Sequence, residues 1–278
     1  MSGNGNGGDR DFSLFARYQD YLDRITGGMS GVRRWKKYHR DGLETVGEHT
    51  VQQTYIVRDL YDLECSCGSP HGLDEALLLR CSMIHDTGEG VNEWDAPQPL
   101  KQHAVIGPLL EQMEHEAVRE HVIGPMPKPL ADMLTRDYAV QHDMESRNGR
   151  FFRASEVVGY VIRAVQQYRL GERDPASIAR RLGAQVFAHQ YRDICKWAEE
   201  FVSVRIVLDQ FREEVEYALL HDSECIAYAQ QHGKDEEIRS LIAARGNGDT
   251  SFHDDADRRE RAPVVAEQAA GAEGPKEF

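Results

Sequence analysis

The chain has 278 residues and carries 33 lysines and arginines against 47 aspartates and glutamates, a formal charge of −14 at neutral pH. A chain of this length can bury a substantial core, so folding needs no disulfide or metal staple. The negative charge repels phosphate backbones and anionic lipid surfaces. We therefore expect neither extended nucleic acid nor a membrane as a partner, and a small anionic ligand would need a few local cations or a metal ion.

Apolar runs are short and the cysteines are scattered. No stretch approaches the length of a membrane span, and the glycine- and asparagine-rich start lacks an apolar signal core. The five cysteines are odd in number and do not resemble the disulfide framework of a secreted fold. These features predict a cytoplasmic protein with reduced thiols.

The composition divides the chain into a folded centre and two polar ends. Residues 1–10 and the acidic tail at 246–278 lack periodicity and are predicted to be disordered. Between them the apolar residues recur at helical spacing, without convincing alternating runs of β-branched residues. We therefore predict an all-α fold.

The first predicted helix spans residues 48–63, because His49, Ile56, Leu60 and Leu63 fall on one stripe. This stripe should face the core, which would place His49 at the start of a buried face.

The next predicted helix begins at residue 73 or 74 and ends at His85, with Gly88 and Gly90 as its terminators. His85 and Asp86 would then lie at a helix end and face inward. The proline-rich residues 95–101 cannot continue a helix and are predicted to form an extended loop.

Further helices are predicted in the rest of the folded part. They cover residues 104–120, 129–143, 150–169, 175–181, 184–231 in one or two pieces, and 235–245.

Ionisable side chains stand where a plain helical core would use aliphatic ones. They are His49 on the first stripe and His85, Asp86 and Glu89 at the end of the second. Burying such groups is costly unless they are paired or bind a metal ion. Two imidazoles and a carboxylate suit zinc, manganese, iron or cobalt. Taken alone, each histidine is more often a hydrogen-bonded core residue, so the joint pattern carries the metal hypothesis.

Four ordered motifs make the sequence resemble the HD-domain metal-dependent phosphohydrolases, and among them the 5′-deoxynucleotidase type, over residues 31–171. The motifs are Arg34-Trp35, Glu44-Thr-Val-Gly-Glu-His49, His85-Asp86-Thr-Gly-Glu89 and Asp95-Ala-Pro-Gln-Pro-Leu-Lys101. The resemblance implies an HD-domain helical bundle over residues 11–172. Residues 173–245 would then form a C-terminal helical extension packed on the same domain, serving as a cap or a homodimer surface.

The resemblance also implies a ligand set for one divalent transition metal, Co, Mn, Zn or Fe. His49, His85 and Asp86 match three of the family's ligands, and Glu156 stands where the family has an aspartate. Glutamate can bind the same metals, but its extra methylene lengthens the arm by about 1.5 Å, which the backbone would have to absorb. The alternative for Glu156 is an ordinary helix carboxylate.

The remaining motif positions imply catalytic and substrate-binding roles. Glu89 would orient or deprotonate the attacking water, and Asp95 would be a second acid/base group near the leaving oxygen. Arg34 would clamp phosphate or sugar, Trp35 would stack on base or sugar, and Lys101 would complete the substrate-binding set. Without the resemblance, Arg34 belongs to a basic run that usually lies in solvent, and Trp35 could be core.

The reaction implied is hydrolysis of a deoxynucleoside monophosphate to deoxynucleoside and phosphate. Alternatives are a triphosphohydrolase acting on dATP or another dNTP, a guanosine-tetraphosphate hydrolase, and a non-catalytic nucleotide-binding protein with a degenerate site, for which Glu156 is the warrant. A dinuclear cyclic-dinucleotide phosphodiesterase is disfavoured, because the later histidines stand singly in the sequence. These are His103, His115, His121 and His142.

Overall fold

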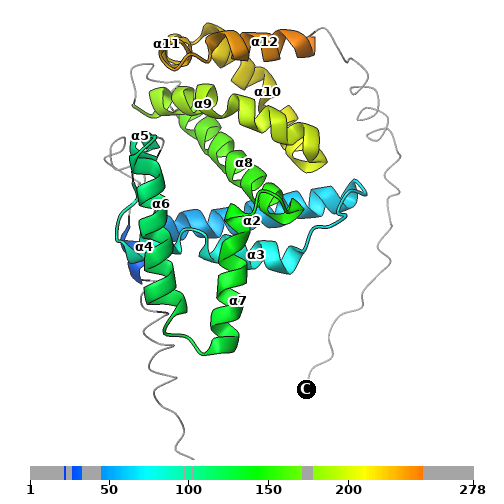
Figure 1. Cartoon of the computed structure of the whole chain (residues 1–278). Helices are drawn as coiled ribbons and strands as arrows, with labels where there is room; N and C mark the ends of the chain where they lie inside the picture. Colours follow the sequence, from blue (N-terminus) through cyan, green and yellow to red (C-terminus); the bar gives the residue numbers. More distant parts are fainter. Residues whose placement is uncertain are drawn as a thin grey trace, which may run out of the picture. The chain divides into compact units, whose positions relative to one another are not determined.

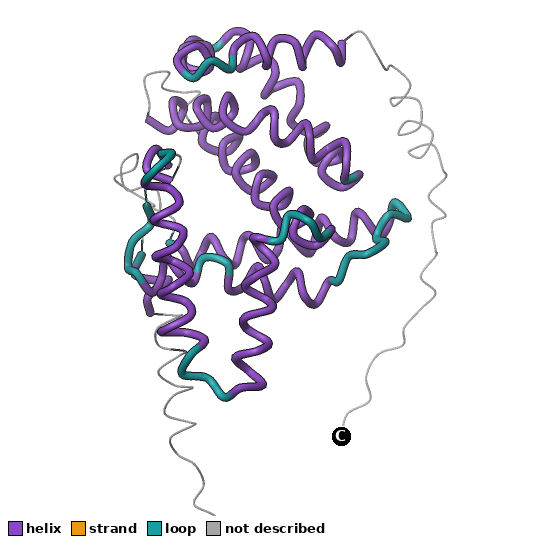
Figure 2. The backbone as a smooth tube through the Cα atoms, viewed as in Figure 1, coloured by secondary structure: helices purple, strands orange, loops and turns teal. Residues whose placement is uncertain are grey.

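The computed structural model describes residues 22, 27–32, 45–96, 98–101, 103–170 and 178–246. The chain divides into a compact unit ending at Ile238 and a second unit over Arg239–Phe278. Within the described residues the regular structure is helical, apart from one isolated bridge residue at Thr45. The predicted all-α fold is confirmed (Figure 1; Figure 2). The two ends predicted to be disordered lie almost wholly outside the described residues.

The described helices follow one another with short connections. They are α2 (Val46–Ser66), α3 (Glu75–Ile84), α4 (Thr87–Val91), α5 (Gln98–Lys101), α6 (Ile106–Ala117), the π-helix η1 (Val118–Ile123), α7 (Lys128–Ala139), the 3-10 helix η2 (Val140–His142), α8 (Arg147–Leu170), α9 (Ile178–Glu200), α10 (Val202–His221), α11 (Ser223–Gln231) and α12 (Asp235–Gly246). A helical turn also covers residues 27–31. Of the second unit, the structure describes only the end of α12.

Helix α2 begins with a capping box. The Thr45 hydroxyl accepts a hydrogen bond from the Glu48 backbone N–H, and the Glu48 side chain accepts one from the Thr45 N–H. The helix therefore starts slightly earlier than predicted. Its buried face is also rotated from the predicted stripe, because Val46, Val57 and Leu60 are buried whereas His49 is only half-buried. His49 lies at the edge of the core, where its ring can reach a ligand.

The buried face of α2 also carries polar groups that connect it to later helices. The Gln53 amide donates to the Ser155 hydroxyl of α8 at 2.8 Å, and that hydroxyl donates to the Phe152 carbonyl. Gly159 lies opposite, where a Cβ would come within 2.9 Å of the Gln53 Oε1 atom. This contact fixes the register between α2 and α8.

At the other end of α2, a buried glutamate reaches the C-terminal helices. The Glu64 side chain is fully buried, and its Oε2 atom accepts a hydrogen bond from the Ser203 backbone N–H at 2.9 Å in the first turn of α10. Its other oxygen lies 3.5 Å from the Arg147 guanidinium. Because the N-terminus of a helix carries a partial positive charge, the carboxylate is stabilised from both sides.

Helix α8 is central to the unit. One apolar stripe of α8 is buried throughout, and its members are Ala154, Val157, Val158, Val161, Val165 and Tyr168. Helices α8 and α9 pack closely at Gly183, where a Cβ would lie 2.7 Å from the Ala164 carbonyl oxygen. Helix α9 in turn contacts α10 and α11, and α10 contacts α2.

Three predicted elements differ from the structure. Residues 98–101 form a short helix in place of an extended loop, with Pro99 in its first turn, where a missing N–H costs nothing. Residues 184–231 belong to three helices, because Phe201 and Asp222 leave the helical backbone conformation. Of the helix predicted at 175–181, residues 175–177 lie outside the described residues, and the rest belongs to α9, which continues without a break from Ile178 to Glu200.

Among the helices described, none is long and apolar enough to cross a membrane.

Replacing the buried Glu64 should weaken the unit strongly. The change Glu64→Ala leaves Arg147 and the first turn of α10 without their shared carboxylate, and we expect a loss of about 3–5 kcal/mol in the free energy of unfolding. Asp132→Ala is the matched control, because it breaks an exposed ion pair with Lys128 and should cost under about 1 kcal/mol. Chemical denaturation measures both, and equal losses would contradict the assigned role of Glu64.

Candidate metal centre and its surroundings

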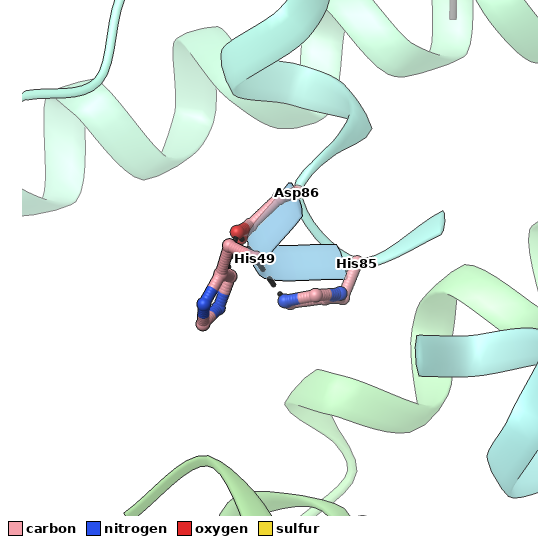
Figure 3. Close-up of side chains that lie close together, drawn as sticks. All are labelled: His49, His85 and Asp86. Carbon is pink, nitrogen blue, oxygen red and sulfur yellow. Dashed lines mark ion pairs between the residues drawn. The ribbon is translucent and has the colours of Figure 1, made fainter. Parts of the chain in front are cut away.

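Two helices bring the predicted histidines and aspartate together. His49 lies in the first turn of α2, His85 ends α3, and Asp86 joins α3 to α4. The Asp86 Oδ2 atom lies 3.6 Å from His49 Nε2 and 3.3 Å from His85 Nε2. Figure 3 shows the three side chains gathered together. One ligand atom from each residue lies within 4.8 Å of the other two. His49, which lies 36 positions before His85 in the sequence, thus joins the adjacent His85 and Asp86 in one compact donor set.

The tautomer of His85 is fixed by its backbone. Its Nδ1 atom lies 2.8 Å from the Ser82 carbonyl oxygen. Because a carbonyl oxygen only accepts, Nδ1 carries the hydrogen and Nε2 presents a lone pair. The Nε2 atom is buried and lies 3.3 Å from Asp86 Oδ2, without a hydrogen bond of normal geometry to the described part of the chain. A buried acceptor left open in this way, next to a carboxylate, fits a metal ligand.

The electrostatics of His85 favour a cation. Burial is the largest single influence and lowers the pKa of His85, but the Asp86 carboxylate and, more distantly, the Glu156 carboxylate outweigh it. The net result is a raised pKa. The same negative surroundings would stabilise a divalent ion in place of the proton.

The two predicted acid/base residues share one lysine. The ammonium group of Lys101 in α5 forms an ion pair with the Glu89 carboxylate and lies 3.2 Å from Asp95 Oδ1. The Glu89 side chain is buried in α4, whereas Asp95 is only partly buried. Lys101, predicted to bind substrate, therefore also holds these two carboxylates in place. Its cation offsets their mutual repulsion.

Glycines allow α4 to pack closely against two neighbours, helix α6 and the helical turn at residues 27–31. A Cβ on Gly88 would lie 3.0 Å from the Glu114 Cβ of α6, and a Cβ on Gly28 would lie 2.5 Å from the Gly90 carbonyl oxygen. The prediction that Gly88 and Gly90 terminate a helix was wrong, because both lie inside α4. Gly88 and Gly90 allow the neighbouring backbone to approach α4 closely, and this packing fixes the position of Glu89, which lies between them in α4.

Glu156 lies near the three clustered residues without joining them. Its Oε2 atom accepts a hydrogen bond from Arg153 Nη1 at 3.1 Å, and its side chain is 14% exposed. It is absent from the compact donor set, although its charge acts on His85. Its role as the fourth ligand stays a prediction. The predicted substrate residues Arg34 and Trp35 lie outside the described residues.

A family model described as 5′-deoxynucleotidase YfbR-like matches residues 20–204, about two thirds of the sequence. The chain belongs to this family. It is accordingly a metal-dependent phosphohydrolase of the HD-domain type, as the four motifs predicted. The YfbR-like match includes the three clustered residues, Glu156 and all of α9. The boundary predicted at residue 172 stays a prediction.

One solved structure agrees with the YfbR-like match at the level of the fold. An HD-domain phosphohydrolase from Listeria innocua is similar at 15% identity and a TM-score of 0.58, over 81% of this chain and 99% of that one. A conserved hypothetical protein from Pyrococcus furiosus aligns at 17% identity with a TM-score of 0.44, over 65% of this chain and 99% of that one. No curated protein matched the sequence significantly.

The structure adds two residues of this YfbR-like protein that motif reasoning missed. Glu114 of α6 is within electrostatic reach of Asp86, Asp95 and Lys101. Burial raises the pKa of Glu114, Lys101 opposes the rise, and the neighbouring carboxylates add to it. Burial also raises the pKa of Tyr138 in α7, with Glu114 and Asp86 contributing. Neither residue belongs to a short motif, since only the packing of α6 and α7 brings them near the site.

Moving α4 should impair catalysis in this YfbR-like enzyme. The change Gly28→Ala forces a Cβ against the backbone of Gly90 and should displace Glu89, so we expect kcat to fall on the order of 10- to 100-fold. The adjacent change Gly27→Ala meets nothing within 4 Å and should leave kcat unchanged. Steady-state kinetics and thermal unfolding of both variants make the comparison. A Gly28→Ala enzyme with normal kcat would disprove the positioning role.

Proposed function

We propose that this protein hydrolyses deoxynucleoside 5′-monophosphates to deoxynucleoside and phosphate, using one divalent transition metal. The observation that carries the proposal is His85 Nε2, which is buried, open and 3.3 Å from the Asp86 carboxylate. A mixed set of imidazole and carboxylate donors suits Mn, Co, Fe or Zn. His49, His85, Asp86 and Glu156 are the proposed ligands.

The metal ion would supply Lewis acidity at the phosphate and lower the pKa of the attacking water. The other steps belong to the side chains. Glu89 takes the proton from the water, and Asp95 serves the leaving 5′ oxygen as the second acid/base group. Lys101 keeps both carboxylates at fixed positions through its two ion pairs. Arg34 is proposed to bind the phosphate, and Trp35 to stack on the base or sugar.

The cysteines support the proposed cytoplasmic location. All five are free thiols, and Cys81, Cys195 and Cys225 are buried. Reduced thiols are typical of the cytoplasm, where small nucleotides are also available as substrates.

Product analysis tests the reaction. The full chain, loaded with Mn²⁺ or Co²⁺, is incubated with each deoxynucleoside mono- and triphosphate, and phosphate, pyrophosphate and triphosphate are quantified. We expect phosphate from monophosphates alone, and His85→Ala should reduce kcat/KM at least about a hundredfold. Triphosphate release from a dNTP would replace the proposed substrate with the alternative one. No turnover with any nucleotide would overturn the enzymatic proposal.

Substitutions at Glu156 test the fourth ligand. If its carboxylate binds the ion, Glu156→Gln should weaken metal affinity about 10- to 100-fold or more, and Glu156→Asp should restore part of it. The control is Arg153→Gln, which removes the ion-pair partner but keeps the carboxylate. Isothermal titration with Mn²⁺ or Co²⁺ measures the affinities. Unchanged affinity in Glu156→Gln would leave Glu156 as an ordinary helix carboxylate.

A further inference from the structure

A second group of metal-binding side chains lies outside the site described above. The His115 and His142 Nε2 atoms approach to 2.7 Å, although the two residues are 27 positions apart in the sequence. The Glu111 Oε1 atom lies 3.4 Å from His142 Nδ1. One donor atom from each of the three residues lies within 4.8 Å of the other two. The motifs gave no role to any of them.

Three helices build this cluster. Glu111 and His115 are one turn apart on α6, and His142 ends η2, which continues α7. The His115 and His142 rings meet edge to face, with centroids 4.2 Å apart. The Tyr138 ring packs against both, at 5.6 Å from His115 and 5.7 Å from His142. The aromatic packing limits how far either imidazole can turn away.

The approach of the two imidazoles constrains their protonation. Two imidazolium groups could not face each other at 2.7 Å, so at least one Nε2 atom presents a lone pair. The Glu111 carboxylate lies beside the same ring, with its Oε1 atom 3.4 Å from His142 Nδ1. At least one imidazole of the pair can therefore offer its lone pair to a metal ion.

We propose that Glu111, His115 and His142 form a second site for a divalent transition-metal ion, separate from the first. Two imidazole nitrogens and a carboxylate match the preferences of Zn, Co, Mn or Fe. Two nitrogens that bind one ion at about 2.0–2.1 Å lie roughly 3.0–3.4 Å apart at ordinary ligand angles. The observed separation is 2.7 Å, so small side-chain rotations suffice to admit the ion.

The second site lies within electrostatic reach of the first. Glu114 and Tyr138 each experience the charges of both Asp86 and Glu111. His142 likewise experiences the charge of Glu156. An ion at the second site would therefore reduce the negative potential around the first, where an anionic substrate is proposed to bind.

The rival interpretation is a hydrogen-bonded histidine pair at the surface. The metal site and the histidine pair predict different numbers of bound metal ions per chain. Equilibrium dialysis and Co²⁺ absorption spectra measure this number on the full chain after bound metal has been removed. We expect two equivalents of Co²⁺ in the unaltered protein and one in His142→Ala or His142→Gln. Glu111→Gln should weaken binding of the second equivalent about tenfold or more.

Matched variants separate the two sites. His121→Ala removes an exposed imidazole from η1 and should retain both equivalents. His85→Ala should lose only the first equivalent, and His85→Ala combined with His142→Gln should lose both. The proposal is overturned if the His142 variants bind as many equivalents as the unaltered protein, with unchanged affinity. Failure of the proposed reaction would not affect these counts.

Discussion

The hydrogen bond from His85 Nδ1 to the Ser82 carbonyl decides what the centre of this protein can do. It lies within the last turn of α3, so the backbone of the helix itself selects the tautomer and turns Nε2 toward Asp86 and His49. Burial then makes the open nitrogen costly unless a cation occupies it. The neighbouring helices bring further functional side chains to His85. Helix α2 brings His49 to the edge of the core, and α4 begins one residue after Asp86 and carries Glu89.

Local charges reconcile the overall acidity of the chain with an anionic substrate. The formal charge of −14 would repel a nucleotide at long range. At the site, negative residues are gathered where they attract cations, namely Asp86 beside the histidines and Glu89 and Asp95 around Lys101. The protein thus uses its acidic character to hold positive charge. That positive charge is what a phosphate group would meet.

The periodicity of apolar residues in the sequence predicted the features that lie within a single helix. The all-α fold and the helix predicted at residues 150–169, which lies within α8, follow from spacing, and the HD motif identified the compact donor set. Contacts between helices could not be predicted in this way. Gly88 and Gly90 appeared to be helix terminators, because nothing in the sequence shows that Glu114 packs against α4. The same holds for His115 and His142, which stand singly in the sequence and touch in the fold.

Glu156 illustrates how packing constrains a departure from the family pattern. Its extra methylene could in principle be absorbed by sliding α8 along α2. The preceding residue prevents this, since Ser155 is hydrogen-bonded to Gln53 of α2 and to the Phe152 carbonyl, all in the buried interior. The register of the two helices is therefore fixed at the position of the replacement. If Glu156 binds the proposed ion, its longer arm therefore has to be accommodated by its own side-chain torsions. Its carboxylate now accepts a hydrogen bond from Arg153, and the proposed ion would have to compete with that contact.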